Sequence, residues 1–304
     1  MTQKAKRNLI ENIQIWALLL VPVVLGFAVF YLIPKIDAIL LAFRGYDEKG
    51  KLTYVGLANF KAFFEYFSES ASDPTVRTAL SNSLKNYLIG LIGPPICVFI
   101  AYYIFKKLPL AKVYQYVVMI PQIISSFVLC LVFFKYVENA LPSTMKQLGF
   151  LNFPNVLNDE RYTYGTTLFY SIWSGFATTI LLFSSSMNSI DTSVIESARL
   201  DGVGFFQEMF YIVVPLIGGT ISTGFITSIG GIFTASGPLI AFWEYNAPPE
   251  TINMGYYFTQ QVMLHQQDQV TYPMLAAMGL VFTLISTPLV LLVKKLCDKI
   301  VPEV

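Results

Sequence analysis

Charge is scarce in this chain: Lys, Arg, Asp and Glu together make up 13% of its 304 residues, about half of the roughly 25% found in soluble domains. This is too little charge to cover a water-facing surface, which excludes an ordinary soluble enzyme and a disordered chain. The 20 basic residues are matched by 19 acidic ones, so no basic excess points to a nucleic-acid partner. Apolar residues make up 55% of the chain. Of the broad classes of protein, the one that this composition still allows is a membrane protein.

Histidine and cysteine are also rare. His265 is the only histidine, and the three cysteines lie far apart at Cys97, Cys130 and Cys297. This excludes a disulfide scaffold, and one histidine cannot build a zinc site without matched cysteine or carboxylate partners. The apolar segments hold no Ser–His, paired Asp or His–Glu–His set that could act on a substrate. We therefore expect no metal, no cofactor and no catalytic residue, and the chain is not predicted to be an enzyme.

Six apolar stretches approach the length of about 20 residues that a helix needs to cross a bilayer. They run over Trp16–Ile33, Tyr87–Phe105, Val113–Phe134, Thr166–Met187, Tyr211–Phe242 and Pro273–Val293. The fifth is long and rich in glycine, so we expect it to bend or break. The first follows a basic segment as in a signal peptide, but no A-x-A-like site follows it, and we predict a retained helix.

Basic residues in short loops predict the orientation, because cytoplasmic loops carry an excess of Lys and Arg. If the N-terminus lies in the cytoplasm, the segments on the cytoplasmic side contain most of the basic residues of the short loops. These residues are Lys4, Lys6, Arg7, Lys106, Lys107, Lys112, Arg199, Lys294, Lys295 and Lys299. The loop 244–272 between the fifth and sixth spans has neither Lys nor Arg. Six spans with this start put both termini in the cytoplasm, in an all-α membrane protein.

The chain is predicted to form one transmembrane domain over residues 1–304. Its parts are a first helix at about 16–33, an outer loop at about 45–80, a five-helix core at about 81–296 and a cytoplasmic loop at about 188–210. The outer loop is expected to hold a short interfacial helix, because four phenylalanines share one helical face. They are Phe60, Phe63, Phe64 and Phe67.

The cytoplasmic loop is the most informative segment. Asp191 or Ser193 can cap a short helix there, and Glu196 can complete a capping box with Ser193. Gly202 can end that helix with a positive φ. The plain alternative is a loop that only connects two spans, but this one is longer than a helical hairpin needs. It also carries apolar residues that need a partner surface, so the pattern favours docking to another protein.

A fixed spacing runs through this loop over Glu196-Ser197-Ala198, Gly202, Ile212 and Val214-Pro215. The spacing resembles the EAA loop of bacterial ABC-importer permeases, whose pattern is EAA-x3-G-x9-I-x-L-P. Ser197 stands in place of the first of the paired alanines, and Val214 in place of leucine. These two departures change the packing of the loop slightly and leave the resemblance intact.

Three further segments resemble the carbohydrate-uptake permeases of this group. Val55–Phe60 looks like their VGLxNF segment, Met119–Ser125 contains a P-x-x-I-S stretch, and Thr234–Pro238 stands where they often have TGGGP. The chain is thus similar to a permease subunit of the carbohydrate type, with a type I ABC-importer fold. This resemblance implies a place in the bacterial cytoplasmic membrane. The resemblance implies transport of a sugar or oligosaccharide, with ATPase motion coupled to alternating access through the EAA loop.

The same resemblance implies the partners and the docking residues. A second, homologous permease forms the other half of the membrane pair, and an extracellular or periplasmic binding protein delivers the sugar. Two ATPase subunits bind ATP and magnesium and dock at the cytoplasmic face. The residues implied to couple to them are Glu196, Ser197, Ala198, Arg199, Asp201 and Gly202.

A polar stripe in the fourth span is the candidate substrate path. Its members fall at i, i+3, i+4 and i+7, and they are Ser171, Ser174, Gly175 and Thr178. Hydroxyl groups can hydrogen-bond a sugar, and the rings of Tyr170 and Trp173 flank the stripe and can stack on it. Ser228 in the fifth span and Gln122 in the third are further candidates. The alternative is that small residues serve close helix packing.

Other functions stay open. A permease of the same superfamily for a peptide or amino acid differs from the sugar permease only in the weaker motifs. A secondary carrier or channel is a further alternative, but no carboxylate lies near the middle of a span, where an ion-coupled carrier usually has one.

Overall fold

The computed structural model describes residues 16, 18–47, 50–70 and 72–300. The basic residues Lys4, Lys6 and Arg7, used above to predict orientation, lie outside these ranges. The described residues divide into two compact units, residues up to 67 with 265–281, and residues 68–264 with those from 282 onward.

Four described helices are long and apolar enough to cross a membrane. They are Leu18–Ala42, α4 (Pro74–Phe105), α8 (Glu160–Asn188) and Thr271–Lys299 of α15 (Thr271–Ile300). Two bent pairs bring the number to six if each pair is one span. The first helix ends at Ala42, later than the predicted Ile33, and α4 begins at Pro74, before the predicted Tyr87. Both extensions contain polar residues, so the apolar stretch alone underestimates the length of each helix.

The two bent pairs break at different kinds of sequence. Phe205–Leu216 and Gly218–Gly230 meet at 78°, a bend that the glycine content of this stretch predicts. Ala111–Ile123 and Ser126–Gln147 meet at 101°, and no such break was predicted within Val113–Phe134. Ile124 and Ser125 adopt extended backbone there, with ψ of 140° and 129°, so the helical hydrogen-bond ladder stops between the two helices.

In the first unit, a hairpin follows the first helix, which contains a π segment (Ala28–Leu32) and α2 (Ile33–Ala42). The hairpin pairs β1 (Arg44–Tyr46) with β2 (Leu52–Tyr54), and Gly45 lies opposite Thr53. The side-chain amide of Asn59 donates to the carbonyls of Ala42 and Arg44, at 2.9 and 2.8 Å. Asn59 of the VGLxNF-like segment therefore holds the hairpin to the end of α2.

The phenylalanine face predicted for the loop after the hairpin lies on α3 (Ala58–Ser70). Phe63 is only 2% exposed. Its ring contacts Phe67, and Phe60 contacts Phe43, with centroid distances of 5.6 and 5.2 Å. Phe64 is 57% exposed, so three of the four rings pack within the protein and the fourth faces outward.

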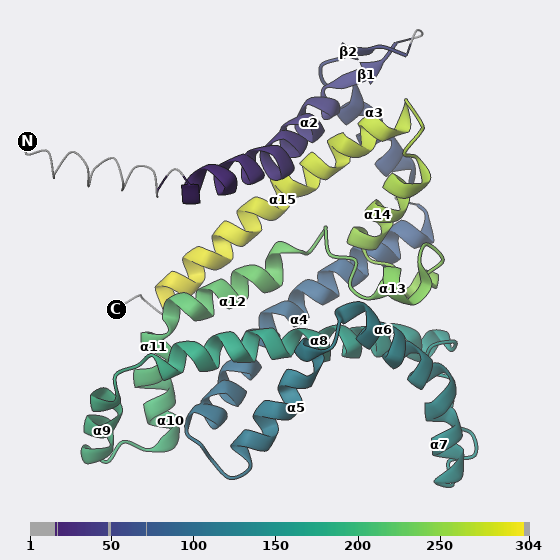
Figure 1. Cartoon of the computed structure of the whole chain (residues 1–304). Coiled ribbons are helices and arrows are strands. Elements are labelled where there is room, and N and C mark those ends of the chain that lie inside the picture. The colour runs from purple at the N-terminus through teal and green to yellow at the C-terminus, as the bar shows by residue number, and fades with distance from the viewer. Residues whose placement is uncertain (1–15, 17, 48–49, 71, 301–304) are drawn as a thin grey trace, which may run out of the picture. The chain divides into compact units, whose positions relative to one another are not determined.

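The second unit is built around α4 and α8, which pack along one another, with α5 (Ala111–Ile123) on α8 and α12 (Gly218–Gly230) on α4 (Figure 1). Gly224 of α12 allows close packing, because a Cβ there would lie 2.7 Å from the buried ring of Phe183. The remaining elements are α6 (Ser126–Lys135), η2 (Tyr136–Ala140), α7 (Leu141–Gln147), α9 (Thr192–Leu200), α10 (Phe205–Glu208), η3 (Met209–Val213), α11 (Val214–Leu216), α13 (Leu239–Trp243), η4 (Pro249–Thr251) and α14 (Met254–Leu264).

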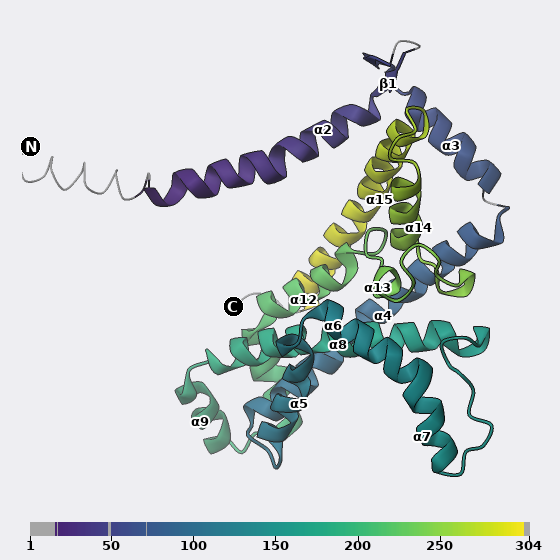
Figure 2. The ribbon, with the colours of Figure 1, turned by 45° about the vertical axis from the view of Figure 1, so that its right-hand side comes forward.

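The short helices lie at opposite ends of α8. Both views place α9 and α10 at its C-terminal end and α7 beyond its N-terminal end (Figure 1 and Figure 2). The loop that resembles the EAA loop is therefore at one end of this unit, together with the turn between α4 and α5.

Candidate functional site

The helix of the EAA-like loop begins at a defined cap. The carboxylate of Asp191 accepts a hydrogen bond from the backbone N–H of Ser193 at 2.9 Å. That N–H lowers the pKa of the Asp191 carboxyl, because the bond stabilises its charged form. Of the two predicted caps, Asp191 is the one used, so Ser193 and Glu196 do not form the predicted capping box at this terminus.

The helix ends in a Schellman turn. Gly202 has φ of +73°, a conformation that costs a residue with a Cβ about 1 kcal/mol. Its N–H donates to the carbonyl of Arg199, and the N–H of Val203 donates to that of Ala198, both at 3.1 Å. These are the two bonds of the Schellman motif. The capped start and the hydrogen-bonded turn give α9 a fixed local shape.

Most of the predicted docking residues are exposed on α9 or in the turn that follows it. Glu196, Ser197, Arg199, Asp201 and Gly202 are exposed, and the neighbouring Leu200 is 88% exposed. Ala198 differs from these residues, because it is only 5% exposed and turns toward the protein with Ile195, which is 7% exposed. An apolar Leu200 among charged side chains provides a surface that another protein can cover.

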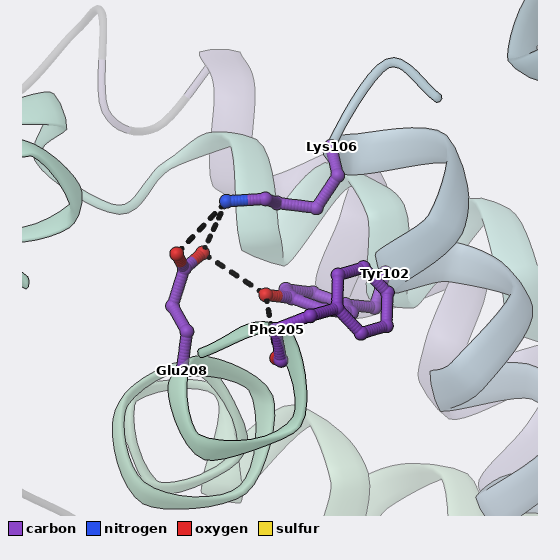
Figure 3. A network of polar contacts seen from close by, with 4 residues as sticks. All are labelled: Tyr102, Lys106, Phe205 and Glu208. Atoms are coloured by element: carbon purple, nitrogen blue, oxygen red, sulfur yellow. Dashed lines mark hydrogen bonds and ion pairs between the residues drawn. The ribbon is translucent and has the colours of Figure 1, made fainter. Parts of the chain in front are cut away.

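A buried ion pair at the base of this loop escaped the sequence analysis. Lys106, at the end of α4, donates to both carboxylate oxygens of Glu208 in α10 at 2.8 Å (Figure 3). The hydroxyl of Tyr102 lies 3.0 Å from the same carboxylate and 3.2 Å from the carbonyl of Phe205. Sequence reasoning used Lys106 only to predict orientation, and no periodic pattern connects it to a glutamate so distant in the chain.

A cavity of about 670 Å³ lies in the second unit between α4, α8 and α12. Ser171, Gly175 and Ser228 of the predicted substrate path line it. The hydroxyls of Ser171 and Ser228 donate to backbone carbonyls four residues earlier, both at 2.9 Å. Each oxygen therefore retains lone pairs that can accept a hydrogen bond from a ligand hydroxyl.

A second cavity of about 680 Å³ adjoins the first. Four residues line both: Ser171, Gly175, Gly237 and Pro238. Gly237 belongs to the TGGGP-like segment and has φ of +60°, and a Cβ on it would lie 3.5 Å from the Ser171 hydroxyl. All residues that line either cavity in the described part of the chain are uncharged.

The other candidates of the predicted path are divided between these sites. Gln122, Tyr170 and Ser174 line the second cavity, whereas Thr178 and Trp173 line neither of the two. Tyr170 is only 5% exposed, because its ring packs against Phe133, Trp173 and Phe242 with centroid distances of 4.8, 6.1 and 5.3 Å. In this conformation the faces of Tyr170 are occupied by aromatic neighbours.

Comparisons with known proteins agree on one family. The sequence signature described as "binding-protein-dependent transport system inner membrane component" matches residues 93–301. The arabinooligosaccharides transport system permease protein of Bacillus subtilis (strain 168) is 26% identical over 233 residues, covering 75% of this chain and 71% of that protein. The sn-glycerol-3-phosphate transport system permease protein of Yersinia enterocolitica is 27% identical over 206 residues, 66% of either chain.

The fold is also similar to a solved one. A chain of a bacterial alginate ABC transporter, in complex with alginate pentasaccharide-bound periplasmic protein, matches with a TM-score of 0.73 and 20% identity, over 98% of this chain and 98% of that one. The two chains therefore share a fold across nearly their whole length.

Proposed function

Because this chain belongs to the family of binding-protein-dependent transport system inner membrane components, we propose that it is the permease subunit of an ATP-driven importer for a sugar or oligosaccharide. Subunits of this kind carry the cargo across the membrane and perform no bond chemistry themselves. ATP and magnesium are then bound by separate ATPase subunits, and this chain needs no cofactor.

The exposed face of α9 is the observation that carries the proposal. Its charged residues surround an apolar side chain, Leu200, that is 88% exposed. The cap at Asp191 and the Schellman turn at Gly202 hold this face in one shape. A rigid, partly apolar knob suits insertion into a cleft of an ATPase, where Glu196 and Arg199 pair with charges of the partner. Closure of the ATPase dimer then moves α9 and the spans attached to it.

The proposed topology has six spans, with each bent pair counted as one, and both termini in the cytoplasm. Lys106 and Lys107 follow α4, and Lys112 is the second residue of α5. Both views place the turn between α4 and α5 at the same end of the second unit as α9 (Figure 1 and Figure 2). The positive-inside rule assigns this end of the second unit to the cytoplasm. That is the side on which ATPase subunits reside.

The proposed complex contains a second, homologous permease, two ATPase subunits and a binding protein outside the cytoplasmic membrane. The solved relative supports the last of these, since it was captured with a periplasmic protein that carries a pentasaccharide. The similar curated protein from Bacillus subtilis is named for arabinooligosaccharides, which supports a carbohydrate cargo here.

The two adjoining cavities are the proposed sugar path on this subunit. Ser171 and Ser228 accept hydrogen bonds from sugar hydroxyls, and Gly175 leaves room for the ring. Gln122 and Ser174 extend the polar surface into the second cavity. For Tyr170 and Trp173 to stack on the cargo, the aromatic cluster around Phe133 must open, so we propose this contact only for another state of the transport cycle. Thr178, which lines neither cavity, is proposed to face the path only after such a rearrangement.

A non-sugar solute is the second candidate, because one relative is named for sn-glycerol-3-phosphate. An anionic cargo needs a compensating charge in an apolar environment. The uncharged linings of both cavities favour a neutral cargo instead.

The proposal is tested by purifying the tagged chain from its native membrane in a mild detergent. We expect mass spectrometry to identify an ATPase, a second permease and a binding protein. Reconstituted vesicles should then import labelled arabinotriose or another neutral oligosaccharide and ignore labelled glycerol-3-phosphate. Purification of an intact chain without an ATPase contradicts the proposal, and import of glycerol-3-phosphate alone supports the second candidate.

Glu196→Lys sharpens this test, because it reverses a charge on the exposed face of α9. We expect the ATPase to be lost from the purified complex while the chain still inserts. Glu69→Lys is the matched control, since Glu69 is also exposed but lies on α3. Equal recovery of the ATPase with both variants contradicts docking at α9.

A further inference from the structure

The ion pair between Lys106 and Glu208 is unusual for its burial. The Glu208 side chain is 3% exposed and that of Lys106 is 13% exposed. Tyr102, whose hydroxyl completes the network, is 0% exposed. The carboxylate accepts three hydrogen bonds, two from Lys106 and one from Tyr102 (Figure 3). A buried carboxylate requires such partners, because an unpaired charge away from water is strongly unfavourable.

The network joins the C-terminal end of α4 to α10. Lys106 caps the C-terminus of α4, where a cation also interacts favourably with the helix dipole. Glu208 is the last residue of α10, the helix that carries the chain back from α9. Only Asp201 to Gly204 separate α9 from α10, and the side chain of Gln207 accepts a hydrogen bond from the Gly204 N–H at 3.0 Å. A displacement of α9 therefore reaches α10 through a short, hydrogen-bonded turn.

On the other side of the network, α4 extends from Lys106 to the first cavity. α4 contributes Asn86, Gly90, Gly93 and Cys97 to the lining of the first cavity. Tyr102 lies about one and a half turns beyond Cys97 in α4, and the C-cap residue Lys106 lies about one turn further. Gly90 approaches α12 closely, since a Cβ there would lie 3.2 Å from the Ser228 carbonyl oxygen. Movement of the Lys106 end of α4 therefore shifts one side of the cavity against Ser228.

The chemistry of the contact decides how it transmits movement. Apolar surfaces can slide over one another with little loss of energy, because the hydrophobic effect has no direction. A bidentate, buried ion pair holds only one arrangement, since a small shift breaks its hydrogen bonds. The aromatic ring of Phe205, 4.8 Å from that of Tyr102, adds apolar contact to the same joint.

We propose that Lys106 and Glu208, with Tyr102, are positioning residues that transmit the movement of α9 to α4 and so to the cavity. The inference rests on the proposed function, because it assumes that ATPase subunits move α9. Lys106 lies outside the EAA-like pattern, Glu208 occupies one of its unspecified positions, and neither residue lines the cavity. They act through α10 and α4.

The test replaces both charges by apolar side chains in Lys106→Met/Glu208→Leu and follows ATP-dependent movement at the cavity. A buried ion pair replaced by apolar residues of similar volume often leaves stability unchanged, so the complex should assemble. The reporter is Ser228→Cys, reacted with a water-soluble maleimide in nanodiscs that hold the assembled complex, with and without vanadate-trapped ATP. The complex without Ser228→Cys supplies the background rate, which is subtracted because the native Cys97 and Cys130 also line the two cavities.

We expect trapped ATP to change the rate at which the cysteine of Ser228→Cys reacts in the otherwise unaltered complex. In the apolar double variant, we expect trapped ATP to leave this rate unchanged. Lys112→Glu is the control, since Lys112 is exposed and lies near the same turn. An ATP response in the double variant equal to that of the unaltered complex overturns the proposal. Absence of the response in the unaltered complex counts against the proposed function itself, so the two failures are distinguishable.

If the apolar double variant does not assemble, Lys106→Arg and Lys106→Gln decide the question. Arg keeps the charge and Gln removes it, and both have long polar side chains. The proposal requires the ATP response to persist with Arg and to be lost with Gln. Equal responses from the two variants overturn it.

Discussion

The side-chain amide of Asn82 in α4 donates a hydrogen bond to the backbone carbonyl of Ile252 at 2.9 Å, across a sequence separation of 170 residues. The same amide donates to the carbonyl of Glu250 at 2.8 Å. The adjacent hydroxyl of Ser83 accepts a bond from the N–H of Met254 at 2.9 Å. These bonds attach η4 and the residues between η4 and α14 to α4.

Asn82→Ala should destabilise the protein, because it leaves the buried carbonyl of Ile252 and the partly buried carbonyl of Glu250 without this donor. Asn82 is only 2% exposed, and an unsatisfied buried polar group costs about 1–3 kcal/mol. The measurement is the thermal unfolding midpoint of the purified complex in detergent. Asn139→Ala provides the comparison, since Asn139 is exposed, and an equal loss in both variants would contradict this role of Asn82.

Gly202→Ala should weaken coupling without blocking insertion. The φ of +73° at Gly202 disfavours a residue with a Cβ by about 1 kcal/mol, whereas open space surrounds that position. The turn after α9 therefore becomes less populated for a backbone reason alone. Gly204→Ala is the control, because Gly204 has φ of −74°. Uptake and ATPase activity of both complexes are compared, and equal activities would disprove the requirement for positive φ.

Gly175→Leu should block uptake, because the new side chain occupies space shared by the two cavities. A Cβ at Gly175 meets no atom within 4 Å, so the substitution fills the path with little disturbance of packing. Gly165→Leu lies on the same helix and also meets open space, but it lines neither cavity. Uptake of labelled oligosaccharide by vesicles distinguishes them, and normal uptake with Gly175→Leu would exclude this path.

The Asp191 cap should lose its effect only in acid. The Ser193 N–H lowers the pKa of the carboxyl in the folded protein. The contribution of the cap is therefore complete above the unfolded pKa of Asp191, and it is lost as pH falls through the lower folded value. Amide hydrogen exchange of α9, corrected for intrinsic rates, should show constant protection near neutral pH and a loss well below it.

Asp191→Asn removes this titration while it keeps a side-chain oxygen that can cap the helix. Its α9 protection should therefore not fall in acid as that of the original chain does. A decrease in protection of the original chain around neutral pH, or the same acid loss in Asp191→Asn, would show that another group governs the pH response.

Local features of the chain were predictable where neighbours in sequence decide them. The cap and the positive φ of α9 arise from Asp191 and Gly202, each of which bonds within a few residues. The bend between Phe205–Leu216 and Gly218–Gly230 was expected from the glycines of the fifth apolar stretch. The break at Ile124 and Ser125 was missed, because the apolar run continues through it and hydropathy does not detect a change in backbone direction.

The sequence by itself determined membership of the membrane class and the spacing that resembles the EAA loop, because composition, apolar length and motif spacing need no long-range information. The tertiary structure alone decided which distant groups meet. It paired Lys106 with Glu208 across 102 residues and enclosed Tyr170 among aromatic rings. It also brought the side-chain amide of Asn82 to the carbonyl of Ile252. Periodicity predicts which face of a helix is apolar, but the partner of that face depends on how α4, α8, α10 and α12 pack together.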